Sequence, residues 1–339
     1  MAANAFAEWD RFNHRALGGT IFHGTAWMQA VRAAFGHRPW YLIARRGGRI
    51  VGGLPLFEVR SLLAGKLLVS VPYAVYGGSL GEDEEAQKRI QAESYALSRR
   101  VGARMIELRS ERARWTGVRV VDRYVTFRRK LPDEPEDCLA SLPRKARAAA
   151  RHARCRHKLS VSFDDRHLAA VWRLYCDTMR RLGSLNYPFR FFQELIDRTP
   201  GGHLVSLISY GNQPVAGLVT FLFNGVAMPY FVGADARFNH LSVNNFVYLT
   251  AMERAVTEGC HTFDFGRSRR DNHGACAFKQ NQGFAPTPLQ YQVYTPPHGA
   301  GTDLTPSNPK FRMARRLWPL LPAWMARSLG AWLSRHIPG

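Results

Sequence analysis

The chain has 339 residues, and its 46% hydrophobic and 22% charged residues are an ordinary globular composition that excludes wholesale disorder. The 47 Lys and Arg outnumber the 26 Asp and Glu, and the net charge of +21 favours a nucleic acid, an anionic membrane surface or a phosphorylated substrate as partner. The sequence contains no run of eighteen or more apolar residues, so it predicts no transmembrane helix. Its first residues lack a basic start followed by an apolar run, so we expect no secretory signal.

The cysteines favour reduced thiols in a cytoplasmic protein, because their number, five, is odd and none forms a Cys-x-x-Cys pair. Cys155 lies between His152 and His157, but these spacings match no standard metal motif. We therefore expect no bound metal ion.

Two stretches of the chain share one pattern and predict an internal duplication. Residues 42–57 and 207–222 align without a gap, and each reads as a strand, a polar turn and a second strand, which is a β-hairpin signature. Further on, residues 71–73 match 228–230. In both halves a helix that ends at a glycine and a final strand then follow.

Hairpin strands, a helix and another strand, used twice, resemble the GNAT acyltransferase fold in tandem. The resemblance implies an α/β (α+β) protein with two GNAT-like domains, each a mixed twisted sheet with flanking helices. In that fold the sheet opens between its fourth and fifth strands, the acyl donor enters the gap, and backbone N–H groups polarise its carbonyl. The expected organisation is a domain over 1–140, a basic linker helix over 141–159, a domain over 160–295 and a tail over 296–339.

Two segments hold much of the excess charge. Residues 143–158 contain seven Lys and Arg and no acid, among them Arg144, Lys145 and Arg147, and their Ala-rich composition predicts a helix. Residues 310–339 contain six, beginning with Lys310, and again no acid. The linker helix is either a phosphate-binding surface, for tRNA, or a solvated helix. No aromatic residue interleaves there, so we expect neither base stacking nor DNA binding.

The tail combines Trp, Leu and Arg in the composition of an interfacial helix, which suggests contact with an anionic membrane surface; the alternative is a helix packed on the second domain. Pro319 and Pro322 limit a continuous helix to about residue 323 onward. The protein is then cytoplasmic, with peripheral attachment to the inner face of a membrane.

The loop over 233–242 is where a CoA-dependent member of the GNAT fold carries its phosphate-binding glycine pattern, and this loop lacks that pattern. Residues 280–285 fit the pattern formally but precede prolines rather than a helix. Ser242 is an N-cap candidate for the next helix, whose first turn, with Asn244 and Asn245, is a candidate phosphate or carboxylate site. These residues alternatively serve only as caps.

The densest polar cluster follows in residues 264–268, DFGRS, and in Phe278-Lys279. Asp264 is expected to end a strand, where its carboxylate could orient an amine or accept its proton, with Tyr230 as a proton partner. Arg267, Ser268 and Lys279 are candidate substrate-binding residues, the two cations for a phosphate or carboxylate. The structural alternative is an Asp–Arg pair at the strand end.

The 264–268 block, with Phe278-Lys279 and Gly283-Phe284, closely resembles the FemAB-like proteins associated with PEP-CTERM and exosortase systems. Residues 307–312 (SNPKFR), Trp318 and Leu329-Gly330 resemble the closing motif of that family. The resemblance spans nearly the whole chain. It implies a transferase in or near cell-envelope or exopolysaccharide production, because classical Fem relatives add amino acids from aminoacyl-tRNA to a peptidoglycan precursor.

Three functions stay open on this basis. The first is a FemAB-like acyl- or aminoacyltransferase that modifies an amine of an envelope or exopolysaccharide precursor by direct transfer, since no Cys or Ser shows a nucleophile's base partner. The second is a CoA-dependent N-acetyltransferase, and the third a non-catalytic membrane- or nucleic-acid-binding scaffold of envelope assembly. The donor is aminoacyl-tRNA or acyl-CoA, no other cofactor is expected, and the second half is favoured as the active one.

Overall fold

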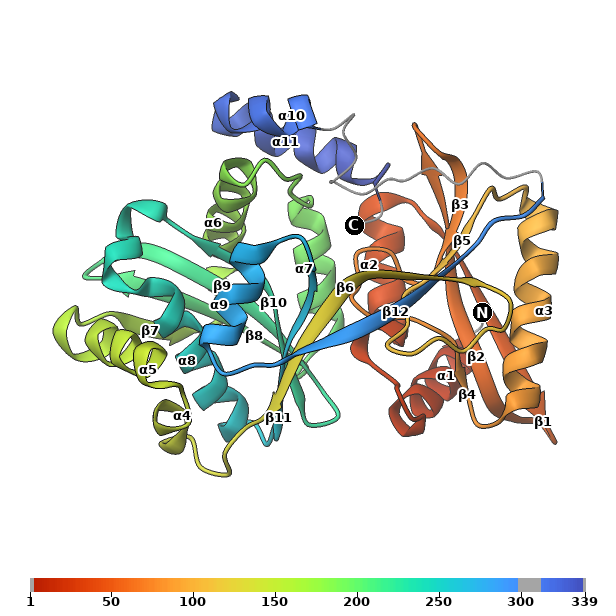
Figure 1. The fold of residues 1–339 in the computed structure, drawn as a ribbon, viewed down its shortest axis with the longest axis horizontal. Helices are drawn as coiled ribbons and strands as arrows, with labels where there is room; N and C mark the ends of the chain where they lie inside the picture. Colours follow the sequence, from red (N-terminus) through yellow and green to blue (C-terminus); the bar gives the residue numbers. More distant parts are fainter. Residues whose placement is uncertain (1–2, 298–311, 338–339) are drawn as a thin grey trace. The chain divides into compact units, whose positions relative to one another are not determined.

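A computed structural model describes residues 3–297 and 312–337, which form two compact units (Figure 1). Unit 1 comprises Met1–Asp122, Pro288–Arg312 and Trp332–Gly339, and unit 2 comprises Arg123–Thr287 and Met313–Ala331. Each unit contains a mixed sheet with flanking helices, so the expected fold class is confirmed.

Unit 1 begins with two helices and is built around a sheet in the order β1-β2-β3-β5-β12, with β4 paired to β2. The expected hairpin is present as β1 and β2, which pair antiparallel, and β3 runs parallel to β5. The elements are α1 (Ala3–Arg15), α2 (Thr25–Phe35), β1 (Arg38–Arg46), β2 (Arg49–Ser61), β3 (Gly65–Val69), β4 (Leu80–Gly81), α3 (Glu84–Val101), β5 (Ile106–Leu108) and β12 (Pro286–Tyr294).

Unit 2 has the sheet order β6-β11-β10-β9-β8-β7, and β8 and β9 form the second expected hairpin. Its strands are β6 (Arg119–Lys130), β7 (Ser160–Phe163), β8 (His203–Tyr210), β9 (Gln213–Phe223), β10 (Val226–Ala234) and β11 (Thr262–Arg269). Its longer helices are α5 (Arg144–Arg151), α6 (Leu168–Arg181), α7 (Phe189–Arg198), α8 (Val243–Thr257) and α9 (His273–Asn281), with the shorter α4 (Asp137–Ala140), η2 (His152–Arg156), η3 (Asp165–His167) and η4 (Ala236–Leu241) between them.

Helices cover both faces of the unit 2 sheet. The core that contains α8 also includes residues of α4, α5 and the strands, for example Val247, Phe263 and Phe265. On α6 and α7, Tyr175 and Phe192 pack against Phe231 of β10. Helix α6 also crosses β9 and β10 closely, because a Cβ at Gly217 or Gly233 would come within 2.6 or 2.2 Å of its atoms.

The basic helix α5 packs within unit 2 on its alanine face. Ala146 and Ala150 are buried, and Ala153 in the following π-helical turn η2 is buried as well. The cations point away from this face, except that Arg154 pairs with Glu253 of α8 at 2.5 Å. The helix is thus a packed element of unit 2 with an exposed positive surface.

The described part of the tail forms α10 (Arg312–Leu317), a turn η6 (Trp318–Leu320) and α11 (Ala323–Ser334), and α11 begins where the prolines predict. Small residues at every fourth position, Ala326, Gly330 and Ser334, are its buried residues. The fit is close, because a Cβ at Gly330 would lie 2.2 Å from Oδ1 of Asn186. Helix α11 therefore packs against the protein through a stripe of small side chains.

Candidate functional site

The sheet of unit 2 opens between β10 and β11. These parallel strands pair only at Val226 with Thr262 and at Ala227 with Phe263, although β10 runs on to Ala234 and β11 to Arg269. The register between β9 and β10 also shifts between Pro229 and Phe231, so Tyr230 occupies a β-bulge at the opening. This is the gap that the resemblance to the GNAT fold implies.

The first turn of α8 follows β10 through η4. Ser242, the residue before the helix, has a left-handed backbone (φ 58°), and its side chain makes no capping hydrogen bond, contrary to its expected role. In the described part of the chain, the N–H groups of Val243 and Asn244 find no acceptor. Asn244 and Asn245 lie half-buried in this turn, where free N–H groups and the helix dipole favour an anion.

Asp264 is fully buried within β11, and the strand runs five residues beyond the point where the sequence predicted its end. Its Oδ2 accepts hydrogen bonds from Nε and Nη2 of Arg128 at 3.0 and 2.8 Å. Its Oδ1 accepts from the Thr126 hydroxyl at 3.2 Å and from the Gly266 N–H at 2.8 Å. The carboxylate is therefore enclosed by partners on β6 and β11.

The Asp-Phe-Gly sequence forms a bulge inside β11. The register with β6 shifts between Asp264 and Arg267, and Gly266 has φ +63°, which glycine adopts without the penalty that a side chain brings. The bond from Gly266 N–H to the Asp264 carboxylate closes a local turn that stabilises this backbone shape. The motif thus has a backbone function in this chain.

Lys279 of α9 holds the carbonyl groups of the same bulge. Its Nζ donates to the oxygens of Phe265, Gly266 and Arg267 at 2.9, 3.1 and 3.4 Å. The ammonium also lies 5.1 Å from the ring centre of Phe127. Burial lowers the pKa of Lys279 to about 8, against the opposing charge of Asp264. Asp264, Lys279 and the backbone of Arg267 therefore form one cluster.

The other predicted residues are placed as follows. The Arg267 guanidinium lies 4.9 Å from the ring centre of Tyr124 on β6, and Ser268 is buried beside it in β11. Tyr230 is half-buried, and its ring contacts Phe221 and Phe231.

The predicted phosphate or membrane contacts lie elsewhere. Arg144 and Lys145 are exposed on α5, whereas Arg147 donates to the Ala140 carbonyl at 3.1 Å and joins α4 to α5. Lys310 lies outside the described residues.

Unit 1 closes the equivalent position. Strands β3 and β5 also pair at only two positions, Leu68 with Ile106 and Val69 with Glu107, but β3 ends there. Arg109, 1% exposed, fills the space beyond and donates to the Ala74 carbonyl at 3.1 Å and to Glu107 at 2.8 Å. Tyr73, the counterpart of Tyr230, is buried in a bend. In unit 2, by contrast, both strands run on beyond their last paired residues, Ala227 of β10 and Phe263 of β11.

A family model for an acetyltransferase (GNAT) domain matches residues 137–280, and no curated protein sequence matches the chain. Among solved structures, FemX is similar with a TM-score of 0.67 at 14% identity, covering 91% of this chain and 98% of that one. A tandem GNAT protein from the clavulanic acid biosynthesis pathway has a TM-score of 0.56 at 13% identity, covering 89% and 97%. The C-terminal domain of a lysylphosphatidylglycerol synthetase from Agrobacterium fabrum has 0.54 at 12%, covering 86% and 92%.

At these identities the structures show a shared fold. Residues 137–280 are thus similar in sequence to a GNAT acetyltransferase domain, and the described part of the chain has a tandem GNAT-like fold. No described helix is long and apolar enough to cross a membrane. Within the described ranges, no group of three or more His, Cys, Asp or Glu side chains could hold a metal ion.

Proposed function

We propose that the chain is an acyl- or aminoacyltransferase that modifies an amine of a cell-envelope or exopolysaccharide precursor by direct transfer. The opening of the unit 2 sheet beyond Ala227 and Phe263 is the observation that carries this proposal. In this proposal an extended acyl donor lies between the two strands. The first turn of α8, whose leading N–H groups can donate to an anion, lies next to it. The GNAT domain match over 137–280 covers this same region.

In the proposed reaction the acceptor amine attacks the ester or thioester carbonyl of the donor. A C–N bond forms, the C–O or C–S bond breaks, and the amine loses a proton. Backbone N–H groups along the open edge of β10 stabilise the oxyanion. Tyr230 at the bulge donates its proton to the leaving oxygen or sulfur and takes up the proton that the amine loses.

Asp264 and Lys279 have a positioning role in this proposal. Asp264 would have to leave the Arg128 guanidinium before it could accept a proton, since both of its oxygens are occupied. Together with Lys279 it fixes the bulge of β11 on the far side of the gap. Arg267 is the proposed contact for an anionic group of the substrate.

The donor is either aminoacyl-tRNA or acyl-CoA. The similarity to FemX and to a lysylphosphatidylglycerol synthetase, whose name states an aminoacylated product, supports the first. The exposed cations of α5, Arg144 and Lys145, suit tRNA phosphates. A CoA-dependent N-acetyltransferase is the second candidate, because the matching family model describes an acetyltransferase and the α8 first turn could take a pyrophosphate.

We expect the wild-type protein to transfer an acyl or aminoacyl group from one of these donors to an amine acceptor. Tyr230→Phe should lower kcat at least tenfold while KM changes little, because general acid catalysis contributes about 10²–10⁴-fold. The assay offers the full chain radiolabelled aminoacyl-tRNA or acetyl-CoA with an amino-sugar acceptor. Tyr210→Phe, an exposed tyrosine on β8, is the matched control and should keep full activity. Saturable CoA binding by calorimetry would select the second candidate. Absence of transfer from both donors would favour the scaffold alternative.

The outward face of α11 is the proposed attachment to an anionic membrane. Opposite its small-residue stripe, Trp324 and Trp332 are 68% and 50% exposed. Leu317 and Leu320 in the preceding segment are also exposed, next to Arg315 and Arg316. Aromatic and aliphatic side chains flanked by cations match the interface of an anionic bilayer.

Replacing both Trp324 and Trp332 with Ser should reduce binding to vesicles of phosphatidylglycerol at least tenfold, because two interfacial indoles are lost from the bilayer surface. Co-sedimentation of the full chain measures the bound fraction. The control exchanges Leu17 and Val120, exposed apolar side chains of unit 1 outside the tail segment, for Ser and should bind normally. Equal binding by wild type and the Trp variant would contradict the membrane role of this face.

A further inference from the structure

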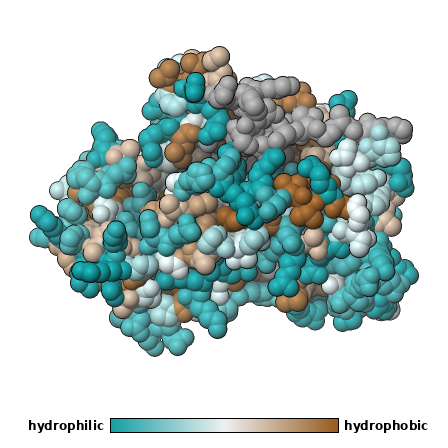
Figure 2. All heavy atoms as spheres, in the orientation of Figure 1, coloured by the Kyte–Doolittle hydropathy of each residue, from teal (hydrophilic) through white to brown (hydrophobic). Residues whose placement is uncertain are grey.

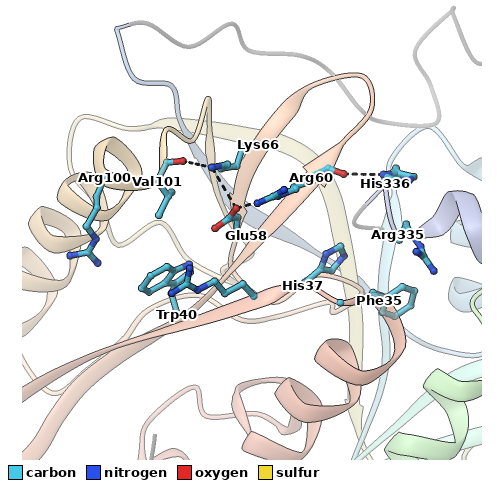
Figure 3. Close-up of a pocket in the computed structure, with 12 residues that line it drawn as sticks. Phe35, His37, Trp40, Glu58, Arg60, Lys66, Arg100, Val101, Arg335 and His336 are labelled. Carbon is cyan, nitrogen blue, oxygen red and sulfur yellow. Dashed lines mark hydrogen bonds and ion pairs between the residues drawn. The ribbon is translucent and has the colours of Figure 1, made fainter.

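A cavity of about 600 Å³ lies wholly within unit 1 (Figure 3). It sits where β2 ends, β3 begins and α3 ends, so it lies at the opposite end of β3 from Val69, where the strand gap of this fold would begin. Its walls come from Phe35, Gly36, His37, Arg38, Trp40, Glu58, Arg60, Lys66, Arg100, Val101, Arg335 and His336.

The lining carries five Lys or Arg side chains against a single carboxylate, Glu58. Glu58 is buried and shared by Arg60 at 3.5 Å and Lys66 at 3.6 Å. The other three cations are Arg38, Arg100 and Arg335, and none of them forms an ion pair with a described residue. Some arginines elsewhere in unit 1 are matched by an acid, for example Arg45 by Glu8 at 2.6 Å. The cavity therefore concentrates positive charge that the protein itself leaves uncompensated.

The walls are held in place by contacts within unit 1. Lys66 Nζ donates to the Val101 carbonyl at 2.6 Å, and a ring nitrogen of His336 bonds the Arg60 carbonyl at 2.9 Å. His37 is buried, and burial, together with the charges of His336 and Arg335, lowers its pKa to about 4. This histidine is therefore neutral near pH 7, and the positive potential comes from the Lys and Arg side chains.

Two of the cations are oriented by an aromatic ring. The guanidinium carbons of Arg38 and Arg100 lie 4.2 and 5.4 Å from the centre of the Trp40 ring. Stacking on an indole leaves the N–H groups of a guanidinium at its edge available for an oxygen anion. The Trp40 Nε1–H is itself buried and without an acceptor among the described residues.

We propose that this cavity binds a small molecule that carries a phosphate or pyrophosphate group. Guanidinium groups bind phosphate oxygens bidentately. Several guanidinium groups that the protein orients before the ligand binds suit a multivalent anion. A volume of about 600 Å³ falls in the range of small-molecule sites rather than of macromolecular surfaces. All residues of this ligand site belong to unit 1, and none of them belongs to the proposed transfer site of unit 2.

Calorimetric titration of the full chain at low salt tests the proposal, with inorganic pyrophosphate and ADP as separate probes. At least one should bind with one-to-one stoichiometry. Tighter binding of ADP would show that the cavity also accepts an organic moiety, and equal binding would show that it recognises phosphate alone. Arg38→Gln and Arg100→Gln should each weaken binding about tenfold or more, the loss of one charge-assisted hydrogen-bonded pair.

The matched control is Arg99→Gln, which removes the same charge from the same helix one residue outside the cavity lining and should leave the affinity unchanged. Failure of both probes to saturate would overturn the proposal. So would an equal loss in the Arg99 variant, since that would reflect the net charge alone. Binding of tRNA, but of neither probe, that depends on Arg38 and Arg100 would replace the small molecule with a nucleic acid.

Discussion

Replacing Arg128 with Ala should lower the free energy of unfolding by about 3 kcal/mol, the size expected when a buried carboxylate loses its cation. Asp264 is fully buried, and the Arg128 guanidinium donates two hydrogen bonds to its carboxylate at 2.8–3.0 Å. The Arg128 side chain is 39% exposed, so solvent already screens part of the pair, and the lower end of the range for buried pairs applies. Denaturant unfolding of both proteins measures the difference.

Two further variants make this result specific. Arg166→Ala breaks a pair of similar length, 2.6 Å to Asp164, in which Arg166 is 88% exposed, so it should cost at most about 1 kcal/mol. Adding Asp264→Asn to Arg128→Ala should restore part of the stability, because the uncompensated charge disappears. If Arg128→Ala and Arg166→Ala were equally mild, Asp264 would not depend on Arg128, and its proposed positioning role would lose its basis.

The sequence predicts the architecture well because the duplication repeats local patterns. The alternation of the hairpins over 42–57 and 207–222 and the glycines that end α3 and α8 each depend on neighbouring residues. Gly102 and Gly259 have φ of +66° and +78°, the left-handed backbone for which glycine is used at helix ends. Local patterns of this kind can be predicted from the sequence without a structure.

The environment of Asp264 cannot be predicted from local sequence patterns. Arg128 and Thr126 lie 136 and 138 positions away in the sequence, on a strand that precedes the whole second repeat. The sequence therefore indicates a carboxylate at a strand end, but only the pairing of β6 with β11 supplies its cation. The Asp-x-Gly spacing was the available signal for the bulge, since a carboxylate two residues before glycine favours a closed turn.

The two halves diverge for a related reason. Residues 71–73 and 228–230 match in sequence, yet Val71 and Tyr73 have positive φ in a bend, and Tyr230 lies in a strand bulge. The difference follows from Arg109, whose buried guanidinium donates to the Ala74 carbonyl and holds that loop across the end of β5. A buried contact of this kind joins residues that are far apart in the chain, so local patterns do not predict it. The cations of the unit 1 cavity are not predicted for the same reason, because they are scattered along the sequence from Arg38 to Arg335.

Lys279 should make the protein more stable as the pH rises from about 8 to about 10.5. Its pKa is about 8 in the folded protein, against an ordinary value of 10.5. Below pH 8 both states are protonated, and the charge penalty of burial is fully present. Between the two values the unfolded chain still holds a proton that the folded protein has released, so stability increases with pH, by about 3 kcal/mol over this range.

The difference between wild type and Lys279→Met isolates this contribution, because other groups that titrate at alkaline pH occur in both proteins. Unfolding by urea at several pH values from 7 to 10.5 should give a wild-type advantage that grows through this window. Lys88→Met, which removes an exposed lysine that pairs with Glu84, should show no such trend. A constant difference across the window would mean that the three carbonyl oxygens offset the cost of burying the ammonium, and that Lys279 stays protonated while it holds the bulge of β11.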